Sequence, residues 1–363
     1  MRATDKTSPL DQTFSIYLDL TRFVAAVMVV LAHYLQHDIV EGSLASFIPN
    51  MGREAVVVFF VLSGFVIAYV TDSKKTSAQE YIAARCGRIY SVVLPTLLLA
   101  WALAEVLGKG GAYQLAKPYI YIPLHLLFLG QSWNLSEVPP LLAPFWSLCY
   151  EVWYYVLFGV AYYLKGWRKM IAIAGVLAVM GFKLWLLLPV WFSGVALYHL
   201  QSRLTLARST ARLGFVLSLS ALAVYNLAGM EMSLRSFAVS LWPFASLPLA
   251  SAERFLADYL VCVLVVLNFL CTRFAGLSGL RRYAGPIRSV AAYTFTLYLS
   301  HMLVVVTWLQ VYPHESRNAY DVAGMTLAIG LVTIILAQLT ERRKARFRQP
   351  VDWILRQRSS SKA

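Results

Sequence analysis

Long apolar stretches separated by short basic segments are the feature that most restricts how this chain can fold. Most of these stretches reach about 17–25 residues, the length that an α-helix needs to cross the hydrocarbon core of a bilayer. Of the 363 residues, 59% are hydrophobic and only 14% are charged, whereas about 25% of the residues in a soluble domain carry a charge. We therefore expect an all-α fold, a polytopic bundle of transmembrane helices.

Ten spanning helices are predicted, with both ends of the chain in the cytoplasm. Lys and Arg are concentrated in the loops that this count places inside, as the positive-inside rule requires. The stretch 119–130 is short for a span, and counting it as one would move the later basic loops outside. We interpret it as an interfacial or re-entrant segment within an outer loop over 108–144. The expected spans are 14–36, 54–71, 88–107, 145–164, 170–188, 189–201, 211–229, 254–272, 289–311 and 321–340.

The net charge of +14 would suggest a nucleic-acid partner in a soluble protein. Here the basic residues lie between apolar stretches, so we interpret them as determinants of membrane topology and expect no nucleic-acid partner. Lys109 and Lys117 are among the few basic residues in the predicted outer loops. The predicted organisation is a cytoplasmic N-terminal segment over 1–13, one membrane domain over 14–340 and a basic cytoplasmic tail over 341–363.

The first apolar stretch contains two ionisable residues, Arg22 and His33. Charged groups inside a membrane segment are costly to insert and by default indicate a functional site. Eleven helical steps of about 100° return His33 to within roughly 20° of the direction of Arg22, about 16 Å further along the helix. One helix face would therefore carry a permanent cation at one depth and a titratable imidazole at another. The alternative is that Arg22 extends to lipid headgroups and His33 caps the far end of the helix.

Three more charged residues near predicted spans are candidates for chemistry. Arg85 and Arg88 lie one helical turn apart at the expected inner face, where guanidinium groups could bind phosphates; ordinary anchoring at the membrane surface is the alternative. Glu151 lies in the expected outer half of the fourth span, where it could orient a histidine or hold a hydroxyl group of a sugar. The alternative is that Glu151 forms a structural ion pair with a buried arginine.

Several uncharged or titratable residues have two interpretations. Ser63 could be a nucleophile, but the pair that it forms with Gly64 more often permits close packing of membrane helices, and we favour packing. His301, close to Tyr298, could take part in proton transfer or be a hydrogen-bonded packing residue. Lys183 is expected to extend to the outer surface. No group of residues has metal-ligand spacing, so we predict no metal site.

Five blocks of sequence, in this order, resemble the acyltransferase-3 family of integral membrane acyltransferases. The first is the Arg-X10-His helix that begins LDLTRF, and the second is FFVLSGF. The others are the arginine-rich RCGRIY with its later proline, WSLCYE and YLSH. They lie at 18–33, 59–65, 85–95, 146–151 and 298–301. In many relatives Ser-Val stands where this chain has Cys149-Tyr150.

The resemblance implies a bundle of about ten helices that takes an acyl group from acyl-CoA, usually acetyl-CoA, and transfers it to a carbohydrate hydroxyl. It implies a multi-pass protein of the bacterial inner membrane whose acceptor is an exopolysaccharide, a lipopolysaccharide or another glycolipid. In this interpretation His33, Arg22 and Glu151 are catalytic, and Arg22, Arg85 and Arg88 hold the phosphates of CoA. Ser63, Tyr298 and His301 support the site.

A protein of a different class could contain the same residues. A transporter or flippase for a glycolipid or small molecule also places Arg, His and Glu side chains inside a membrane as substrate and proton-relay sites. Many transporters are built from internal repeats, and we find no internal repeat in this sequence. Dependence on added acyl-CoA would distinguish the two classes.

Overall fold

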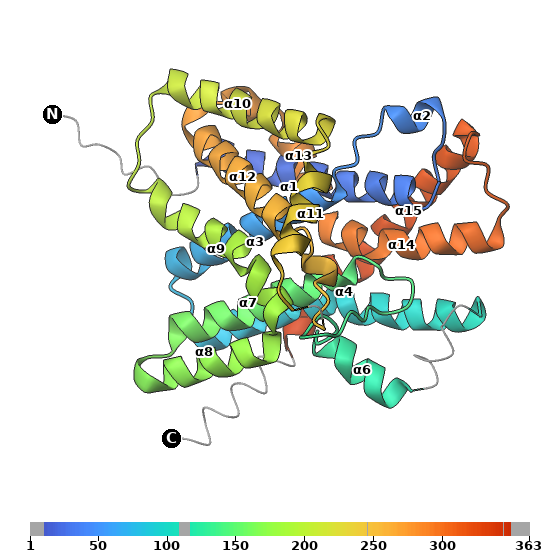
Figure 1. Ribbon diagram of the computed structural model, residues 1–363, viewed down its shortest axis with the longest axis horizontal. Coiled ribbons are helices and arrows are strands. Elements are labelled where there is room, and N and C mark those ends of the chain that lie inside the picture. Colours follow the sequence, from blue (N-terminus) through green and yellow to red (C-terminus); the bar gives the residue numbers. More distant parts are fainter. Residues whose placement is uncertain (1–10, 109–116, 245, 344, 350–363) are drawn as a thin grey trace. The chain divides into compact units, whose positions relative to one another are not determined.

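The computed structural model describes residues 11–108, 117–244, 246–343 and 345–349, and all regular secondary structure in these ranges is helical (Figure 1). Among the described residues, eight helices are long and apolar enough to cross a membrane. The chain is thus a multi-pass membrane protein, and the all-α prediction is confirmed. The eight long apolar helices are α1 (Gln12–Gln36), α3 (Gly52–Lys74), α4 (Ala78–Val106), α9 (Phe182–Gln201), α10 (Arg208–Leu227), α12 (Phe255–Ala275), α14 (Thr294–Val311) and α15 (Ala319–Leu339).

Two further predicted spans, α7 (Phe145–Tyr163) and α8 (Gly166–Met180), are helical but are not among these eight. The count of ten spans and the cytoplasmic placement of both ends therefore remain predictions. The other helical segments are α2 (Ser43–Ser46), α6 (Pro118–Leu126), α11 (Met230–Leu241), α13 (Ala284–Ala291), η1 (Ala250–Ala252), η2 (Ser278–Tyr283) and η3 (Glu341–Arg343). Residues 1–10, 109–116 and 350–363, with Lys109 and most of the predicted tail, lie outside the described residues.

The chain forms two compact units, which we describe separately. The first contains the described residues of Met1–Val29, Asn50–Lys74 and Leu186–Ala292, and so includes the first part of α1 with α3, most of α9, α10, α11, α12 and α13. In it, α12 packs against α10, α11 and α3 (Figure 1). Arg53 at the start of α3 donates two hydrogen bonds to the buried carboxylate of Asp258 in α12, at 2.6 and 3.1 Å.

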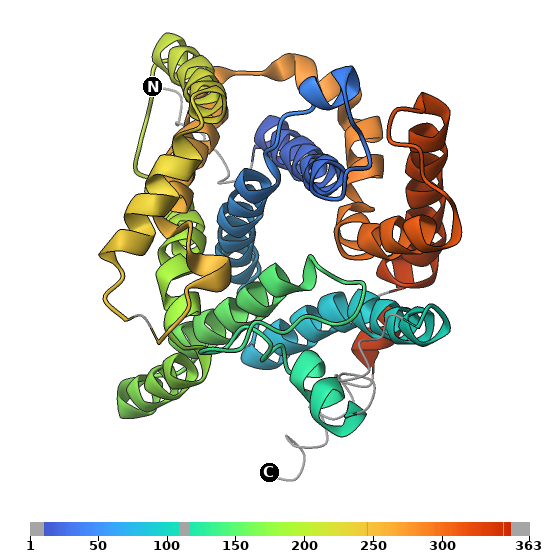
Figure 2. The same cartoon turned by 45° about the vertical axis from the view of Figure 1, so that its right-hand side comes forward.

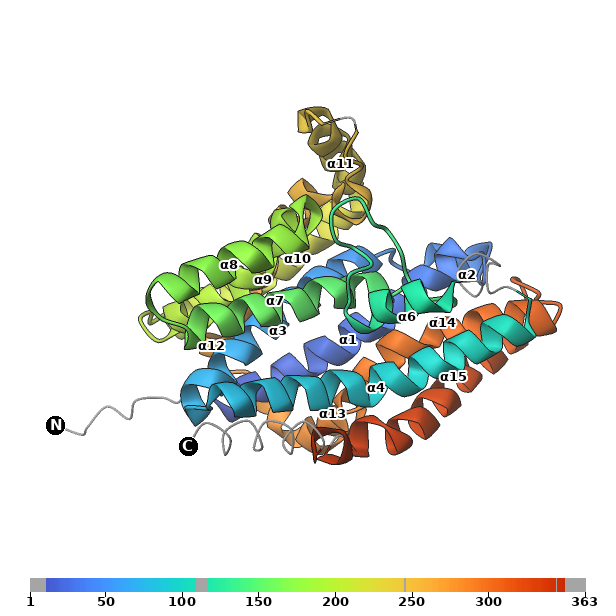
Figure 3. The ribbon, with the colours of Figure 1, turned by 90° about the horizontal axis from the view of Figure 1, so that it is seen from below.

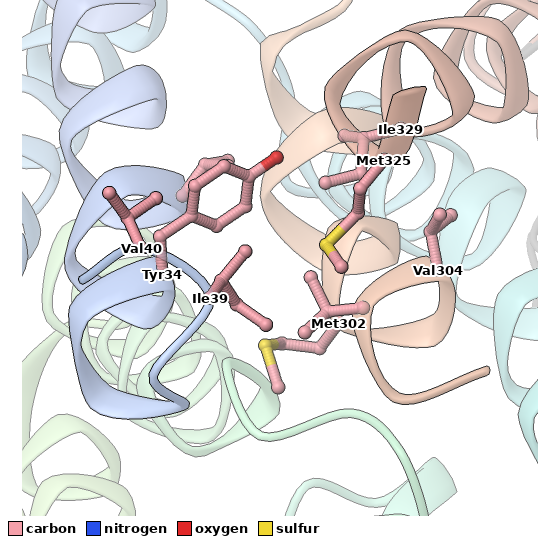
Figure 4. Packing of buried hydrophobic residues seen from close by; sticks show 9 residues of the cluster. Tyr34, Ile39, Val40, Met302, Val304, Met325 and Ile329 are labelled. Atoms are coloured by element: carbon pink, nitrogen blue, oxygen red, sulfur yellow. The ribbon is translucent and has the colours of Figure 1, made fainter. Parts of the chain in front are cut away.

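The second unit contains the described residues of Val30–Pro49, Lys75–Trp185 and Tyr293–Ala363. Here α14 and α15 form a pair of neighbouring helices, drawn in orange and red in Figure 2, and α4 packs against both α14 and α7. The helices α7 and α8 lie side by side (Figures 1 and 3). A buried cluster joins the last turn of α1 and the loop after it to α14 and α15; it includes Tyr34, Ile39, Met302, Met325 and Ile329 (Figure 4).

Three predicted helix boundaries were wrong. The spans 170–188 and 189–201 were divided at Pro189, but the break is at Gly181, and Pro189 lies inside α9. Gly181 has φ 78°, and a Cβ atom there would meet the backbone nitrogen of Trp133 at 2.6 Å. Helix α4 begins at Ala78 instead of 88, because Ser77 and Glu80 form a complete capping box.

The predicted span 289–311 is in fact divided, because α13 ends at Ala291 and α14 begins at Thr294. The short segment 119–130 overlaps α6, which begins at Pro118, is nine residues long and is not among the eight candidate spans of the described residues. Its interfacial or re-entrant placement remains a prediction.

Candidate active site

Two imidazoles meet in the second unit. His33, in the last turn of α1, and His301, in α14, have ring centroids 5.0 Å apart, with His33 Nδ1 at 3.2 Å from His301 Nε2. His301 is completely buried and His33 is partly exposed. The buried cluster of Figure 4 includes Tyr34 and Met302, the residues that follow the two histidines. The packing of α1 against α14 therefore fixes both rings.

The hydrogen bonds of His301 determine which nitrogen of each ring holds a proton. His301 Nδ1 lies 3.0 Å from the carbonyl oxygen of Leu297, one helical turn earlier. A carbonyl only accepts, so Nδ1 of a neutral His301 carries the proton and Nε2 is an acceptor. His33 must then donate from Nδ1, which makes Nε2 the basic nitrogen of a neutral His33. We assign these tautomers from the hydrogen-bond network.

Tyr298 holds the beginning of α7 against α14. Its hydroxyl lies 2.5 Å from the Oγ of Ser147 and donates to the carbonyl oxygen of Pro144 at 3.3 Å. Tyr298 and Ser147 are both buried. Because Tyr298 and His301 are neighbours on α14, the segment that positions His33 also positions the start of the helix that carries Glu151.

Glu151 lies in a cluster with the two arginines of α4. Its carboxylate accepts a hydrogen bond from the hydroxyl of Tyr155, one turn further along α7. The guanidinium of Arg85 lies over the Tyr155 ring, 5.8 Å from its centroid, and Arg85 is within reach of the charges of Arg88 and Glu151. We expected Glu151 nearer the outer side, apart from the arginines. The packing of α4 against α7 instead brings these three charged groups around one tyrosine.

Arg22 and Ser63 belong to the first unit. Arg22, partly buried on α1, donates to Asp19 at 3.2 Å, one turn earlier. Ser63 is buried, and its Oγ accepts a hydrogen bond from the indole of Trp191 at 3.2 Å. A Cβ atom on Gly64 would overlap the carbonyl oxygen of Trp191. The serine and glycine thus permit close approach of α3 and α9, and the packing interpretation is confirmed.

Sequence reasoning missed two buried residues of the second unit. Lys183 is fully buried instead of reaching the surface, and its ammonium group donates to the carbonyl oxygen of Leu135 and, at 3.1 Å, to Ser136 Oγ. It therefore holds the loop that leads into α7. His125 of α6 is fully buried, and neither of its ring nitrogens has a hydrogen-bond partner among the described residues. The burial of each depends on segments distant in sequence, the loop at Leu135 for Lys183 and Phe145 for His125, which no local pattern indicates.

Among the described residues, no cluster of three or more His, Cys, Asp or Glu side chains is placed so that it could hold a metal ion.

The chain belongs to the acyltransferase-3 family. The profile of this family, described as an acyltransferase domain, matches residues 15–342, nearly the whole membrane region. This confirms the resemblance found in the sequence blocks. No solved structure matches the chain.

Three characterised proteins show partial similarity. The acyltransferase MdmB of Streptomyces mycarofaciens is 35% identical over 155 residues, which are 39% of this chain and 38% of MdmB. The exopolysaccharide production protein ExoZ of Rhizobium meliloti is 28% identical over 123 residues, 33% of this chain and 37% of ExoZ. The O-acetyl transferase of Shigella phage Sf6 is 27% identical over 163 residues, 43% of this chain and 48% of that protein. The chain thus matches less than half the length of each of these relatives.

Proposed function

We propose that this protein is a membrane-bound O-acyltransferase, which moves an acyl group from acyl-CoA to a hydroxyl of a cell-surface or exported carbohydrate. Acetyl-CoA is the first donor to consider, because one relative is named an O-acetyl transferase. The name of another relative refers to exopolysaccharide production, which supports a carbohydrate acceptor. The observation that carries the proposal is the His33–His301 pair, because its hydrogen bonds make His33 Nε2 a base.

In the proposed reaction, His33 Nε2 removes the proton of the acceptor hydroxyl while its oxygen attacks the thioester carbonyl carbon. The C–S bond then breaks, and the proton passes from the imidazolium to the sulfur of CoA, so that free CoA and the acyl ester are formed. A positioned general base contributes about 10²–10⁴-fold to the rate. In this mechanism His301 is a positioning residue, because it acts only through His33.

The remaining residues have roles in binding. Arg85 and Arg88 bind the phosphates of CoA, for which planar guanidinium groups are well suited. The role of Arg22 in binding the donor is proposed from the sequence alone. Glu151, held by Tyr155, accepts a hydrogen bond from a hydroxyl of the acceptor. Tyr298 keeps α7 in place. The protein would work in the bacterial inner membrane, with the donor taken from the cytoplasm.

The test is release of CoA from acetyl-CoA by the full-length protein in lipid nanodiscs, with binding of acetyl-CoA measured separately. Release should fall by about 10²-fold or more in His33→Ala, and binding should weaken in Arg22→Ala. His37→Ala is the matched control, because His37 is an exposed imidazole four residues beyond His33. Normal release by His33→Ala would refute the general base. A folded protein that binds no acyl-CoA would refute the acyltransferase assignment and support a transporter.

A further inference from the structure

An apolar groove runs between α4 and α7, within the second unit. Its volume is about 480 Å³, within the range of about 300–1,000 Å³ that is usual for small-molecule sites. Ile82 and Ile89 of α4 and Val156 and Val160 of α7 are among the side chains that form its walls. Arg85 and Tyr155, which have roles in the proposed function, also line the groove, but no ligand has been assigned to its apolar part.

The length of the groove matches one leaflet of a bilayer. Its lining residues on α4 extend from Ala78 to Tyr90 and those on α7 from Val152 to Leu164. Twelve helical steps of about 1.5 Å each give about 18 Å along either helix. The hydrocarbon core of a bilayer is about 30 Å thick, so one leaflet contributes about 15 Å.

The groove opens on an apolar surface. Ile82 and Leu127, which line it, are 46% and 57% exposed, and Val156 is 39% exposed. Large apolar side chains that remain exposed on a membrane-spanning helix face lipid chains. Ile82 lies on α4, which is long and apolar enough to cross a membrane, so we take the opening to face lipid, where a hydrocarbon chain could enter from the side.

Positive charge surrounds one end of the groove. At this end the hydroxyl of Tyr163 donates to the carbonyl oxygen of Thr76 at 2.9 Å and lies 3.0 Å from the Thr76 Oγ1. These two contacts join the end of α7 to the start of α4. Lys75 and Lys165 are exposed and lie one and two residues from this bridge. Arg168 and Lys169 follow in the first turn of α8. Two carboxylates are close in sequence: Glu80 accepts hydrogen bonds from Ser77 in the capping box of α4, and Asp72 accepts one from the hydroxyl of Tyr198.

We propose that this groove binds a hydrocarbon chain of an anionic phospholipid from the leaflet at which α4 begins, with the lipid phosphate near Lys75 and Lys165. The charge of this end favours an anionic headgroup, and the apolar walls favour the chain. The inner wall includes Arg85 and Tyr155, and Tyr155 holds Glu151. A bound chain would thus support the residues that position Glu151. The proposal does not depend on which reaction the protein catalyses.

The test uses the full-length protein in nanodiscs that contain a photoactivatable phospholipid, either phosphatidylglycerol or phosphatidylcholine, with the labelled peptides identified by mass spectrometry. We expect labelling to concentrate on 78–90 and 152–164 and to be stronger with phosphatidylglycerol. Ile82→Trp fills the groove and should reduce this labelling by about tenfold or more. Excluding only two methylene groups of the lipid chain from apolar contact already lowers its affinity by about that factor. Leu98→Trp is the matched control, since Leu98 is 72% exposed on the same helix but outside the groove.

Charge is tested in the double variant Lys75→Gln and Lys165→Gln, which should lose the preference for phosphatidylglycerol. The control is Arg203→Gln with Arg282→Gln, two exposed basic residues of the first unit. Labelling spread evenly over all lipid-facing helices, or unchanged labelling in Ile82→Trp, would overturn the proposal. Displacement of the label by acetyl-CoA, or co-purification of a polyprenyl phosphate in its place, would assign the groove to another ligand and overturn it equally.

Discussion

Burial of His125 without a hydrogen-bond partner among the described residues should make the stability of the protein depend on pH. The imidazole lies in α6, outside the candidate spans, between the rings of Tyr121 and Phe145 at centroid distances of 6.0 and 5.9 Å. Burial lowers the pKa of His125 to about 4, because the charged form would lose its hydration. Phe145 is the first residue of α7, so this packing also anchors the helix that carries Ser147 and Glu151.

The sign and size of the effect follow from linkage. In the unfolded chain the pKa of a histidine is about 6.5, so below that pH the unfolded state binds a proton that the folded state does not. Stability is therefore lost as the pH falls from about 6.5 towards about 4. At about pH 5, proton binding to this histidine shifts the equilibrium about 30-fold towards the unfolded chain. That factor lowers the free energy of unfolding by about 2 kcal/mol. Above about pH 7 the contribution vanishes.

The variant His125→Phe removes the titrating group and keeps an aromatic ring in the site. The free energy of unfolding should be measured by denaturant titration in mixed micelles at about pH 7.5 and about pH 5. Other groups titrate over this range in both proteins, so the informative quantity is the difference between the two pH dependences. His199→Gln, which changes an exposed histidine, is the control and should resemble the wild type. An equal pH dependence in wild type and His125→Phe would refute the reasoning.

Three further predictions concern the site and the packing of helices. His301→Gln should leave binding of acetyl-CoA intact but slow CoA release and change its pH profile, because the tautomer of His33 is no longer fixed; an unchanged pH profile would reduce His301 to a packing residue. Gly194→Ala should destabilise the protein by about 1–3 kcal/mol, since the Cβ of the new alanine would overlap the backbone of α3. The measurement is thermal unfolding, and the control is Gly175→Ala, because Gly175 has open space around it. Asp258→Ala should cost about 3–5 kcal/mol, because it leaves the guanidinium of Arg53, whose side chain is only 11% exposed, without its carboxylate; a small change in the unfolding midpoint would contradict this.

Much of the architecture was predictable because membrane helices are defined locally. The length and apolarity of a stretch determine whether it can span, and each of the eight described helices that are long and apolar enough to cross a membrane overlaps a predicted span. Only α9 was divided wrongly between two predicted spans. Small residues were also informative: Ser63 and Gly64 predicted close helix packing, and the structure identifies the partner as α9. Proline was misleading, because Pro189 is accommodated within α9, whereas the turn at Gly181 depends on the approach of Trp133 from a distant loop.

The pattern of partners was less predictable than the candidate residues. His33 and His301 were both identified, but nothing in the sequence shows that their rings are in contact across 268 positions. Lys183 was assigned to the surface because a lone lysine in an apolar stretch usually extends to the headgroups. Its burial depends on the carbonyl oxygen of Leu135, a main-chain group that every residue possesses. Contacts of this kind become visible only when the chain is folded.

The hydrogen bond from His301 to the carbonyl oxygen of Leu297 has a consequence for how this site can vary. The acceptor belongs to the backbone, so the amino acid at position 297 can change without altering the proton arrangement of the two rings. Selection on that arrangement would act on positions 33 and 301, and the third partner would leave no trace in a comparison of sequences. A survey restricted to invariant side chains would therefore count two residues where the molecule uses three.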